Sequence, residues 1–515
     1  MRRWIWPVVS IGLPAIFIGY LFLYPLGRIL WISLTGAGFV EVFTTTRFRQ
    51  AAWFTFWQAS ASTVLTLVAA LPLTWALSRF RFPGKATLRA MVTVPFALPT
   101  VVVGAAFLAF TNGGVWSILA AHVFYNLAVV VRTVGGVWGR IDPGIEEAAA
   151  VMGASPWRRL RTITLPLLRP ALASAAAIVF LFCFTSFGTV LILGRGRLRT
   201  IEVEIYQQAV NFLDLPAAGA LAVIQIIVVA ATLLISARLQ RRAAAFTVGS
   251  EAGLPRPRSG QRAIIGIVVG ATMTLVMIPL VVLLARSFRG GGAGWRNLFN
   301  DDGAVAIDPL AAIGNSLLFA VVSALIAVVI GGLAAAALAR RGRGSDWFDT
   351  ILMLPLGTSA VTIGFGFLVA LDRPFDLRAT LLLIPLAHAL VAIPFVVRVT
   401  LPLLRSIRRD LREAAAVLGA SPTRVWREID LPIVSRALAV GAGFAAVISL
   451  GEFGATSFIA RPSTATVPTL IFRLLGRPGG ASFATAMALA VVLAALTALV
   501  ILAVDRLRAG EMGTF

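Results

Sequence analysis

Apolar stretches of about 20 residues or more recur along almost the whole chain, and their length limits its fold more than any other feature. Crossing the hydrocarbon core of a bilayer takes about 20 helical residues, and only helices or closed barrels satisfy their backbone polar groups there. Hydrophobic residues make up 59% of the 515 residues and charged residues only 13%, which excludes an ordinary soluble domain. We expect an all-α membrane protein with about twelve spans. The expected spans are the stretch from the first residues to about Leu34 and residues 53–78, 88–111, 115–136, 171–194, 217–239, 263–286, 311–339, 349–371, 379–401, 438–460 and 484–505.

One motif occurs twice at a fixed distance. It reads Glu-Ala-Ala-Ala-Val-Met-Gly-Ala-Ser-Pro from Glu147 and Glu-Ala-Ala-Ala-Val-Leu-Gly-Ala-Ser-Pro from Glu413, an offset of 413 − 147 = 266. Such a repeat indicates two similar halves, over residues 1–240 and 263–515, with a cytosolic linker over 241–262. Both halves start on the same side, so we expect a pseudo-two-fold axis along the membrane normal. The same offset relates His122 to His388, Arg132 to Arg398, and Phe187-Gly188 to Phe453-Gly454.

The motif itself predicts a short helix, a corner and a second helix. Alanines after a glutamate favour helix, and Gly153 is a natural stop. Ser155 before Pro156 is a typical start of the next helix. We expect Pro166 to limit that second helix, because proline lacks an N–H and crowds the preceding turn.

Basic residues between the spans predict the orientation of the chain. The connections over residues 79–85 and 140–161 are rich in arginine and are expected inside, together with both termini. The basic segment Arg195–Arg199 falls outside on the same count and argues against it. The net charge of +23 does not indicate nucleic-acid binding, because the basic residues lie between apolar segments and not along one soluble face.

Several polar residues inside the spans are candidates for function. Glu452 and its counterpart Ser186 are expected either to line or gate a pathway or to make structural hydrogen bonds within the bundle. For His122 and His388 a helix-packing hydrogen bond is favoured over a metal pair, since no carboxylate or thiol cluster accompanies them. The single Cys183 lies in an apolar segment and is expected to be a small core residue. We expect no metal site and no catalytic residues.

The repeated motif, continued by Ile-x-Leu-Pro in both copies, resembles the cytoplasmic loop of permeases in binding-protein-dependent ABC importers. The resemblance covers most of the chain and implies the type I importer fold, with coupling loops at about 140–170 and 406–436 that dock on two copies of a cytosolic ATPase. It also implies a substrate-binding protein outside the membrane and a location in the bacterial plasma membrane. The chain lacks a phosphate-binding loop of its own, so ATP and Mg²⁺ are expected on the ATPase. The residues implied in coupling are Glu147, Ala148, Ala149, Gly153, Glu413, Ala414, Ala415 and Gly419.

A narrower resemblance concerns the solute. Residues 54–59, 81–84, 181–191 and 201–207 are similar to the fused permeases of thiamine importers, and ferric-iron permeases share the fused layout. The resemblance implies thiamine or its phosphates, with ferric iron as the alternative. The sequence departs from the thiamine permeases at the basic segment Arg195–Arg199.

Two other classes of function predict features that this sequence does not show. A secondary transporter driven by an ion gradient predicts inverted repeats, whereas these repeats are parallel. A membrane-bound enzyme predicts catalytic groups clustered at one depth, and the sequence shows no such cluster.

Overall fold

The computed structural model describes residues 2–245, 255–299, 307–339 and 345–509, and all regular elements in these ranges are helices. Ten helical segments are long and apolar enough to cross a membrane, and two bent helix pairs bring the number to twelve if each pair is one span. The prediction of an all-α membrane protein with about twelve spans is confirmed. The long helices are α1 (Arg2–Ile18) with α2 (Tyr24–Thr35), α4 (Thr46–Arg79), α7 (Val115–Trp138), α10 (Leu165–Phe184), α13 (Leu215–Ala245), α14 (Ser259–Ser287), α16 (Pro309–Ala339), α19 (Leu383–Ser406), α22 (Leu431–Gly451) and α25 (Gly480–Ala509).

The predicted spans over 88–111 and 349–371 are each a pair of helices bent by 98°, which makes each either one broken span or a re-entrant loop. The first pair is α5 (Lys85–Ala97) and α6 (Thr100–Leu108). Leu98 between them is extended, the conformation that the following proline favours. The second pair is α17 (Ser345–Met353), continued by a 3₁₀ turn, and α18 (Ala360–Ala370). Here Ser359 starts the new helix, since its side chain accepts a hydrogen bond from the N–H of Val361 at 3.1 Å.

The expected spans over 171–194 and 438–460 end early. α10 stops at Phe184 and α22 at Gly451, and short helices follow: α11 (Gly188–Leu193) and α23 (Thr456–Ile459). The chain packs tightly at this break, because a Cβ atom on Gly188 would lie 2.7 Å from Thr100 Oγ1. Each half therefore carries short helices at one end of its bundle, among them α12 (Ile201–Tyr206) and α24 (Val467–Leu475).

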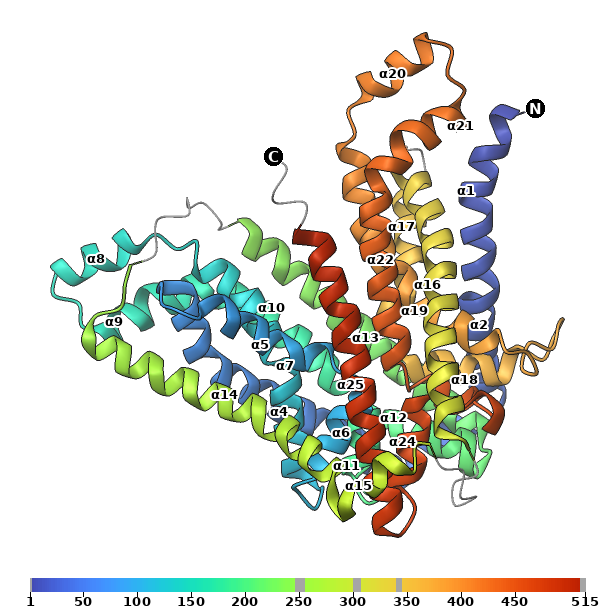
Figure 1. Ribbon diagram of the computed structural model, residues 1–515, viewed down its shortest axis with the longest axis horizontal. Helices are drawn as coiled ribbons and strands as arrows, with labels where there is room; N and C mark the ends of the chain where they lie inside the picture. Colours follow the sequence, from blue (N-terminus) through green and yellow to red (C-terminus); the bar gives the residue numbers. More distant parts are fainter. Residues whose placement is uncertain (1, 246–254, 300–306, 340–344, 510–515) are drawn as a thin grey trace.

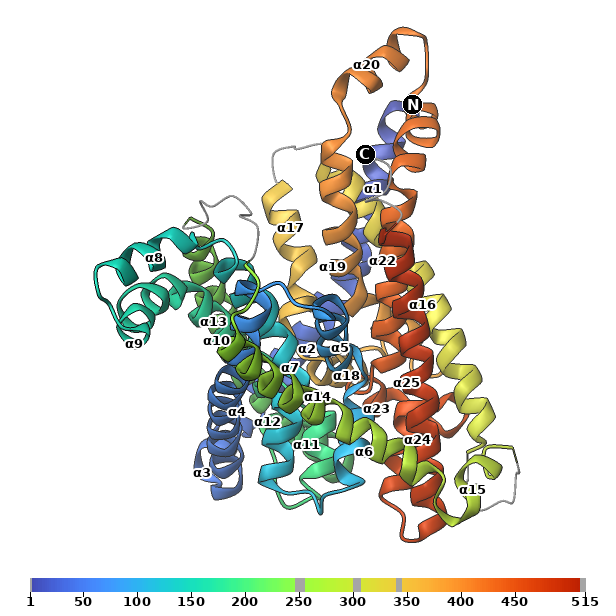
Figure 2. The same ribbon diagram turned by 60° about the vertical axis from the view of Figure 1, so that its left-hand side comes forward.

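The helices form two arms that diverge at one end of the molecule and converge at the other (Figure 1). One arm contains α4, α7 and α10, and the other contains the corresponding α16, α19 and α22. The arms converge around α6, α12, α18 and α24, as the view turned by 60° also shows (Figure 2). Small residues let helices approach closely within an arm; a Cβ atom on Gly331 of α16 would lie 2.9 Å from Val396 Cβ of α19.

The first helix of each half packs against the opposite half. α1 lies along α16, and Ile18, Leu21 and Phe22 near its end are buried in the core of the second-half arm. In the same way α14 lies along α4, where Ile265 packs with Ala76 and Phe80. The crossing of α1 and α14 to the opposite half joins the two halves. The sequence predicted only that each span belongs to the half in which it occurs.

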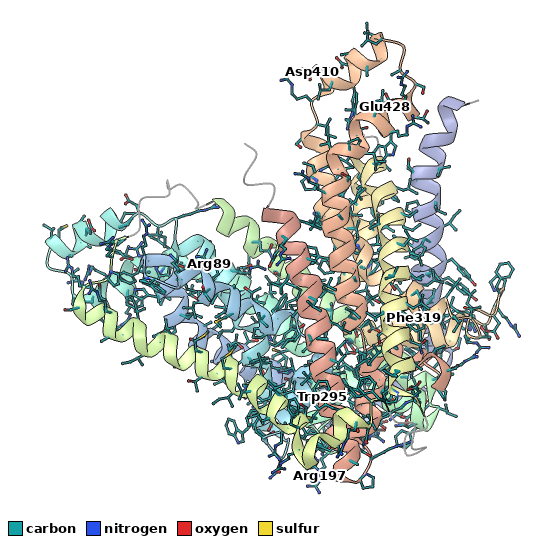
Figure 3. All side chains as sticks on the ribbon, viewed as in Figure 1. Arg89, Arg197, Trp295, Phe319, Asp410 and Glu428 are labelled. Atoms are coloured by element: carbon teal, nitrogen blue, oxygen red, sulfur yellow. The ribbon has the colours of Figure 1, made fainter. Side chains whose placement is uncertain are left out.

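The linker and the basic connections gather on one side. The first linker residues, 241–245, are helical because α13 continues to Ala245, and residues 246–254 lie outside the described residues. Pro255 O then accepts a hydrogen bond from the N–H of Arg81 at 3.0 Å, which places the end of the linker beside the connection over 79–85. Figure 3 shows Arg197 at the opposite end of the molecule from Asp410, which lies next to the second copy of the motif. The basic segment Arg195–Arg199 is therefore remote from the repeated motif.

Candidate functional site

The first copy of the motif is a capped helix, a glycine corner and a second capped helix. α8 (Pro143–Val151) begins after Asp142, whose side chain accepts a hydrogen bond from the N–H of Gly144 at 2.9 Å. Gly153 has φ +80°, a left-handed conformation that costs glycine little. The side chain of Ser155 accepts from the N–H of Arg158 at 3.3 Å and starts α9 (Pro156–Arg159). The expected helix, corner and second helix are confirmed.

The second copy has the same geometry. α20 (Arg409–Val417) ends before Gly419, whose φ is +81°, and Ser421 accepts a hydrogen bond from the N–H of Arg424 at 3.3 Å. α21 (Pro422–Val425) follows. α8 lies at the far end of one arm and α20 at the far end of the other, so each arm carries one copy of the motif at its diverging end (Figures 1 and 2).

Both motif helices expose an apolar pair beside the glycine. Val151 and Met152 are 89% and 88% exposed, and Val417 and Leu418 are both 87% exposed. Val151 and Val417 are the last residues of their helices, and Met152 and Leu418 are the C-caps. Exposed apolar residues at such a position indicate a surface that another protein covers.

The residues implied in coupling lie around these pairs. Glu147, Ala148, Glu413 and Ala414 are exposed, Ala149 and Ala415 are half-buried, and Gly153 and Gly419 form the exposed corners. The structure thus brings each set of four onto one short helix and its turn, but the contacts predicted for them involve a partner, and their role stays a prediction.

A half-buried ion pair holds α8 to its own arm. Glu146 Oε2 lies 2.7 Å from Arg79 Nη2 at the end of α4, and Glu146 Oε1 accepts a hydrogen bond from Thr164 Oγ1 at 2.8 Å. Arg79 Nη1 also donates to Ile141 O at 2.9 Å. Glu146 therefore connects the motif helix both to the end of α4 and to the start of α10.

A different pair holds the motif helix of the second half to its arm. Arg412 of α20 donates from Nε to Asp430 Oδ1 at 2.8 Å, next to the start of α22. Arg412 and Asp430 stand at the offset of 266 from Glu146 and Thr164, since 412 − 146 = 430 − 164 = 266. These four residues were not among the candidates predicted from the sequence, although polar or charged residues at matching positions in both copies are a signal that could have found them.

Pro166 does not limit the second helix, so that expectation is wrong. A π-helical turn over Leu160–Thr164 precedes α10, and Leu165 donates to Leu160 O instead of ending the helix. Pro166 then falls in the first turn of α10, where a missing N–H costs little. The second half repeats this with a π turn over Trp426–Asp430. Each motif therefore continues without interruption into a span, over Pro156–Phe184 and Thr423–Gly451.

Aromatic rings from the two halves meet where the arms converge. Phe187 and Phe453, related by the offset of 266, stack with their ring centroids 5.4 Å apart. Tyr206 lies 5.5 Å from Phe187, and its counterpart Phe472 lies 5.5 Å from Phe453. Phe458 adds a further contact with Tyr206 at 5.4 Å. We call these five residues the aromatic junction.

The two histidines make buried hydrogen bonds between helices, as expected. His122 Nε2 lies 2.9 Å from Ser186 Oγ and its Nδ1 lies 3.0 Å from Ser62 Oγ. Ser186 is thus a partner of His122 inside the first half. In the second half His388 Nδ1 lies 2.7 Å from Ser449 Oγ.

Glu452, the counterpart of Ser186, has its partners within its own half. Its carboxylate accepts hydrogen bonds from the N–H groups of Ala455 and Thr456 at 2.8 and 3.0 Å, and lies 3.2 Å from His388 Nε2. These contacts cap α23 and support the structural interpretation of Glu452. A pathway or gating role for Ser186 and Glu452 stays a prediction.

The basic segment Arg195–Arg199 is partly neutralised. Arg199 Nη1 lies 3.2 Å from Glu204 Oε1, and Arg47 Nε lies 2.8 Å from the same oxygen. Arg195 donates to Asn112 O at 3.4 Å, and both Arg195 and Arg197 are exposed. The segment therefore presents two exposed cations at the converging end of the arms.

Comparison with known proteins shows the same two-fold repeat. The family model described as "Binding-protein-dependent transport system inner membrane component" matches residues 62–245 and 327–509. The chain is 30% identical to a thiamine transport system permease protein of Brucella abortus, over 95% of the chain and 94% of that protein. It is 26% identical to the thiamine transport system permease protein of Escherichia coli, over 87% of each. A sulfate transport system permease protein of Escherichia coli is 32% identical, over 44% of the chain and 88% of that protein.

Proposed function

The chain belongs to the family of binding-protein-dependent transport system inner membrane components, and from this membership we propose that it is the complete membrane pathway of an ATP-driven importer. The observation that carries the proposal is the pair of matching, exposed motifs at the diverging ends of the two arms. The ATP is hydrolysed by separate ATPase subunits, which also hold the Mg²⁺.

Two copies of one ATPase dock on α8 and α20. The exposed pairs Val151-Met152 and Val417-Leu418 enter apolar depressions on the ATPases, and the neighbouring alanines allow close approach of the helix backbone. Glu147 and Glu413 are exposed beside them and pair with basic groups on the partner. Two like motifs fit two identical partners.

Movement of an ATPase passes from the motif helix to the spans. Glu146 joins α8 to α4 and α10 in the first half, and Arg412 joins α20 to the start of α22 in the second. Because each motif also continues directly into a span, a displaced motif helix turns the arm as a body. The rigid arms then alternate access to a pathway between the halves.

Thiamine or a thiamine phosphate is the proposed solute, on the basis of the relatives that match nearly the whole chain. The motif end lies in the cytosol with both termini, and an extracytoplasmic binding protein delivers the solute to the converging end in the plasma membrane. Ferric iron stays the alternative prediction, and no observation favours it over thiamine. The parallel repeat and the family membership support ATP-driven import and not ion-driven transport.

Uptake by reconstituted vesicles tests the proposal. The chain, its ATPase and its binding protein are reconstituted, and labelled thiamine is supplied on the binding-protein side. We expect uptake that requires ATP and the binding protein and that persists when proton and sodium gradients are collapsed. Uptake driven by an ion gradient without the ATPase would contradict the proposal. Uptake of ferric iron and not thiamine would overturn the solute alone.

A further inference from the structure

A fully buried carboxylate lies between the two halves. Glu202 on α12 is 0% exposed. Its Oε2 accepts a hydrogen bond from Ser359 Oγ at 2.8 Å, and Gln225 Nε2 of α13 donates to its Oε1. Ser359 belongs to the second half, where it caps α18 at the bend of the α17–α18 pair. Figures 1 and 2 place α12 and α18 together where the arms converge.

Among the described residues no basic group forms an ion pair with Glu202, and burial raises the pKa of its carboxyl group to about 8, so a proton neutralises it unless a cation comes close. Its recorded partners, Ser359 and Gln225, are neutral, whereas Glu204, two residues along, pairs with Arg47 and Arg199. A buried carboxylate without an opposite charge is unfavourable in a low-dielectric environment. The position corresponding to Glu202 at the offset of 266 is Pro468, so the repeated architecture does not need an acid there.

Unused hydrogen-bonding capacity lies beside the carboxylate. Gln225 is 1% exposed, and its Oε1 has no hydrogen-bond partner. Buried polar atoms are almost always paired in proteins, so the unpaired amide oxygen next to Glu202 leaves one hydrogen-bond position open at this place.

The aromatic junction begins one helical turn from Glu202. Tyr206 follows Glu202 by four residues on α12, so both lie on the same side of that helix. Its ring contacts Phe187 of the first half and Phe458 of the second. Aromatic faces attract cations, most strongly where water is excluded. Burial raises the pKa of the Tyr206 hydroxyl group, and the exposed Arg473 opposes part of that rise.

We propose that Glu202 and the aromatic junction form the pathway site for an aromatic organic cation, seen here with the halves closed around it. The carboxylate balances the positive charge, and the rings of Tyr206 and Phe187 stack on the ligand once the arms separate. This inference rests on the proposed import function and gives its solute a chemical class. A thiazolium ring, as in thiamine, belongs to that class.

Transport of a charged and a neutral solute tests the site. Vesicles containing the chain, its ATPase and its binding protein are supplied with thiamine or with a neutral isostere in which an uncharged ring replaces the thiazolium. We expect Glu202→Gln to lower kcat/KM for thiamine uptake at least tenfold, about 1.4 kcal/mol, and to change uptake of the isostere less than twofold. Glu202→Asp keeps the charge and is expected to retain most of the activity. Equal losses for both solutes would show a structural contact between the halves, and no loss for either would also overturn the proposal.

Direct binding separates this inference from the identity of the solute. Equilibrium dialysis measures binding of N-methylquinolinium, an aromatic cation, to the permease–ATPase complex. We expect Tyr206→Leu and Glu202→Gln each to weaken binding at least fivefold, with elution of the complex unchanged in size-exclusion chromatography. Glu202-dependent binding without any thiamine uptake would refute thiamine as the solute and retain the site. Binding that is the same in wild type and both variants would refute the site whatever the importer carries.

Discussion

Replacing Arg412 by alanine tests whether the ion pair with Asp430 transmits movement. Arg412 Nε lies 2.8 Å from Asp430 Oδ1, and the two side chains are 32% and 12% exposed. The variant leaves a nearly buried carboxylate without its cation. A hydrogen bond to a charged group contributes about 1.5–3 kcal/mol, and partial exposure of the arginine favours the lower part of that range. We therefore expect the variant to lose about 2 kcal/mol of the free energy that holds α20 against the start of α22. This loss shifts the equilibrium between the held and the released position of α20 about 30-fold.

The assay is the ratio of thiamine imported to ATP hydrolysed in reconstituted vesicles. We expect Arg412→Ala to lower this ratio about tenfold or more while ATP hydrolysis continues, because α20 still binds the ATPase but is joined to α22 only through the chain at the α20–α21 corner. Arg424→Ala is the matched control on the same loop. Arg424 and Glu428 form an exposed i,i+4 pair at 3.0 Å, which contributes at most about 0.5 kcal/mol. A ratio for Arg412→Ala within twofold of wild type, or an equal loss in Arg424→Ala, would refute the reasoning.

Three further predictions concern other contacts. Replacing Val417 and Leu418 by aspartate should lower the co-purifying ATPase from two copies to one, held by α8, without lowering the melting temperature, since both side chains are exposed; two retained copies would argue against docking at α20. Glu452→Gln should lower the melting temperature, because the carboxylate caps α23 and contacts His388, while transport per folded molecule stays within twofold; a selective loss of transport would instead support the pathway role. Gly188→Ala should destabilise the protein by about 1–3 kcal/mol in a thermal unfolding assay, because its Cβ would lie 2.7 Å from Thr100 Oγ1, and an unchanged melting temperature would contradict this packing.

Local chemistry explains what the sequence could predict. Apolar length determines which segments cross a membrane, so the number of spans followed from composition alone. The corner of the motif followed from Gly153 and Ser155, because a left-handed residue and an N-cap act within a few residues of themselves. The internal repeat predicted that Phe187 and Phe453 are equivalent, and the structure brings them into contact.

The bent helix pairs and the contacts between the two halves could not be predicted from local sequence, because they depend on the packing of the whole fold. Proline alone does not locate a bend, since Pro72 lies inside α4 and Pro394 inside α19, whereas the chain turns by 98° next to Pro99. The prediction that Pro166 limits the second helix was wrong because a π turn over Leu160–Thr164 accommodates the proline. No pattern in the sequence predicted that turn. Glu202 and Ser359 are 157 residues apart, and only the packing of one half on the other brings them together.

The two copies of the motif differ on one side and agree on the other. The residues that hold each helix to its arm differ in chemical type between the halves, because Glu146 corresponds to Arg412 and Thr164 to Asp430. The exposed residues are of the same chemical type in both copies: Glu147 is matched by Glu413, Ala148 by Ala414, Val151 by Val417 and Met152 by Leu418. A contact inside one arm needs only a complementary partner in that arm, so its residue types are free to differ. A surface that meets the same partner twice must present the same chemistry twice, and the exposed side of the motif is the side that does so.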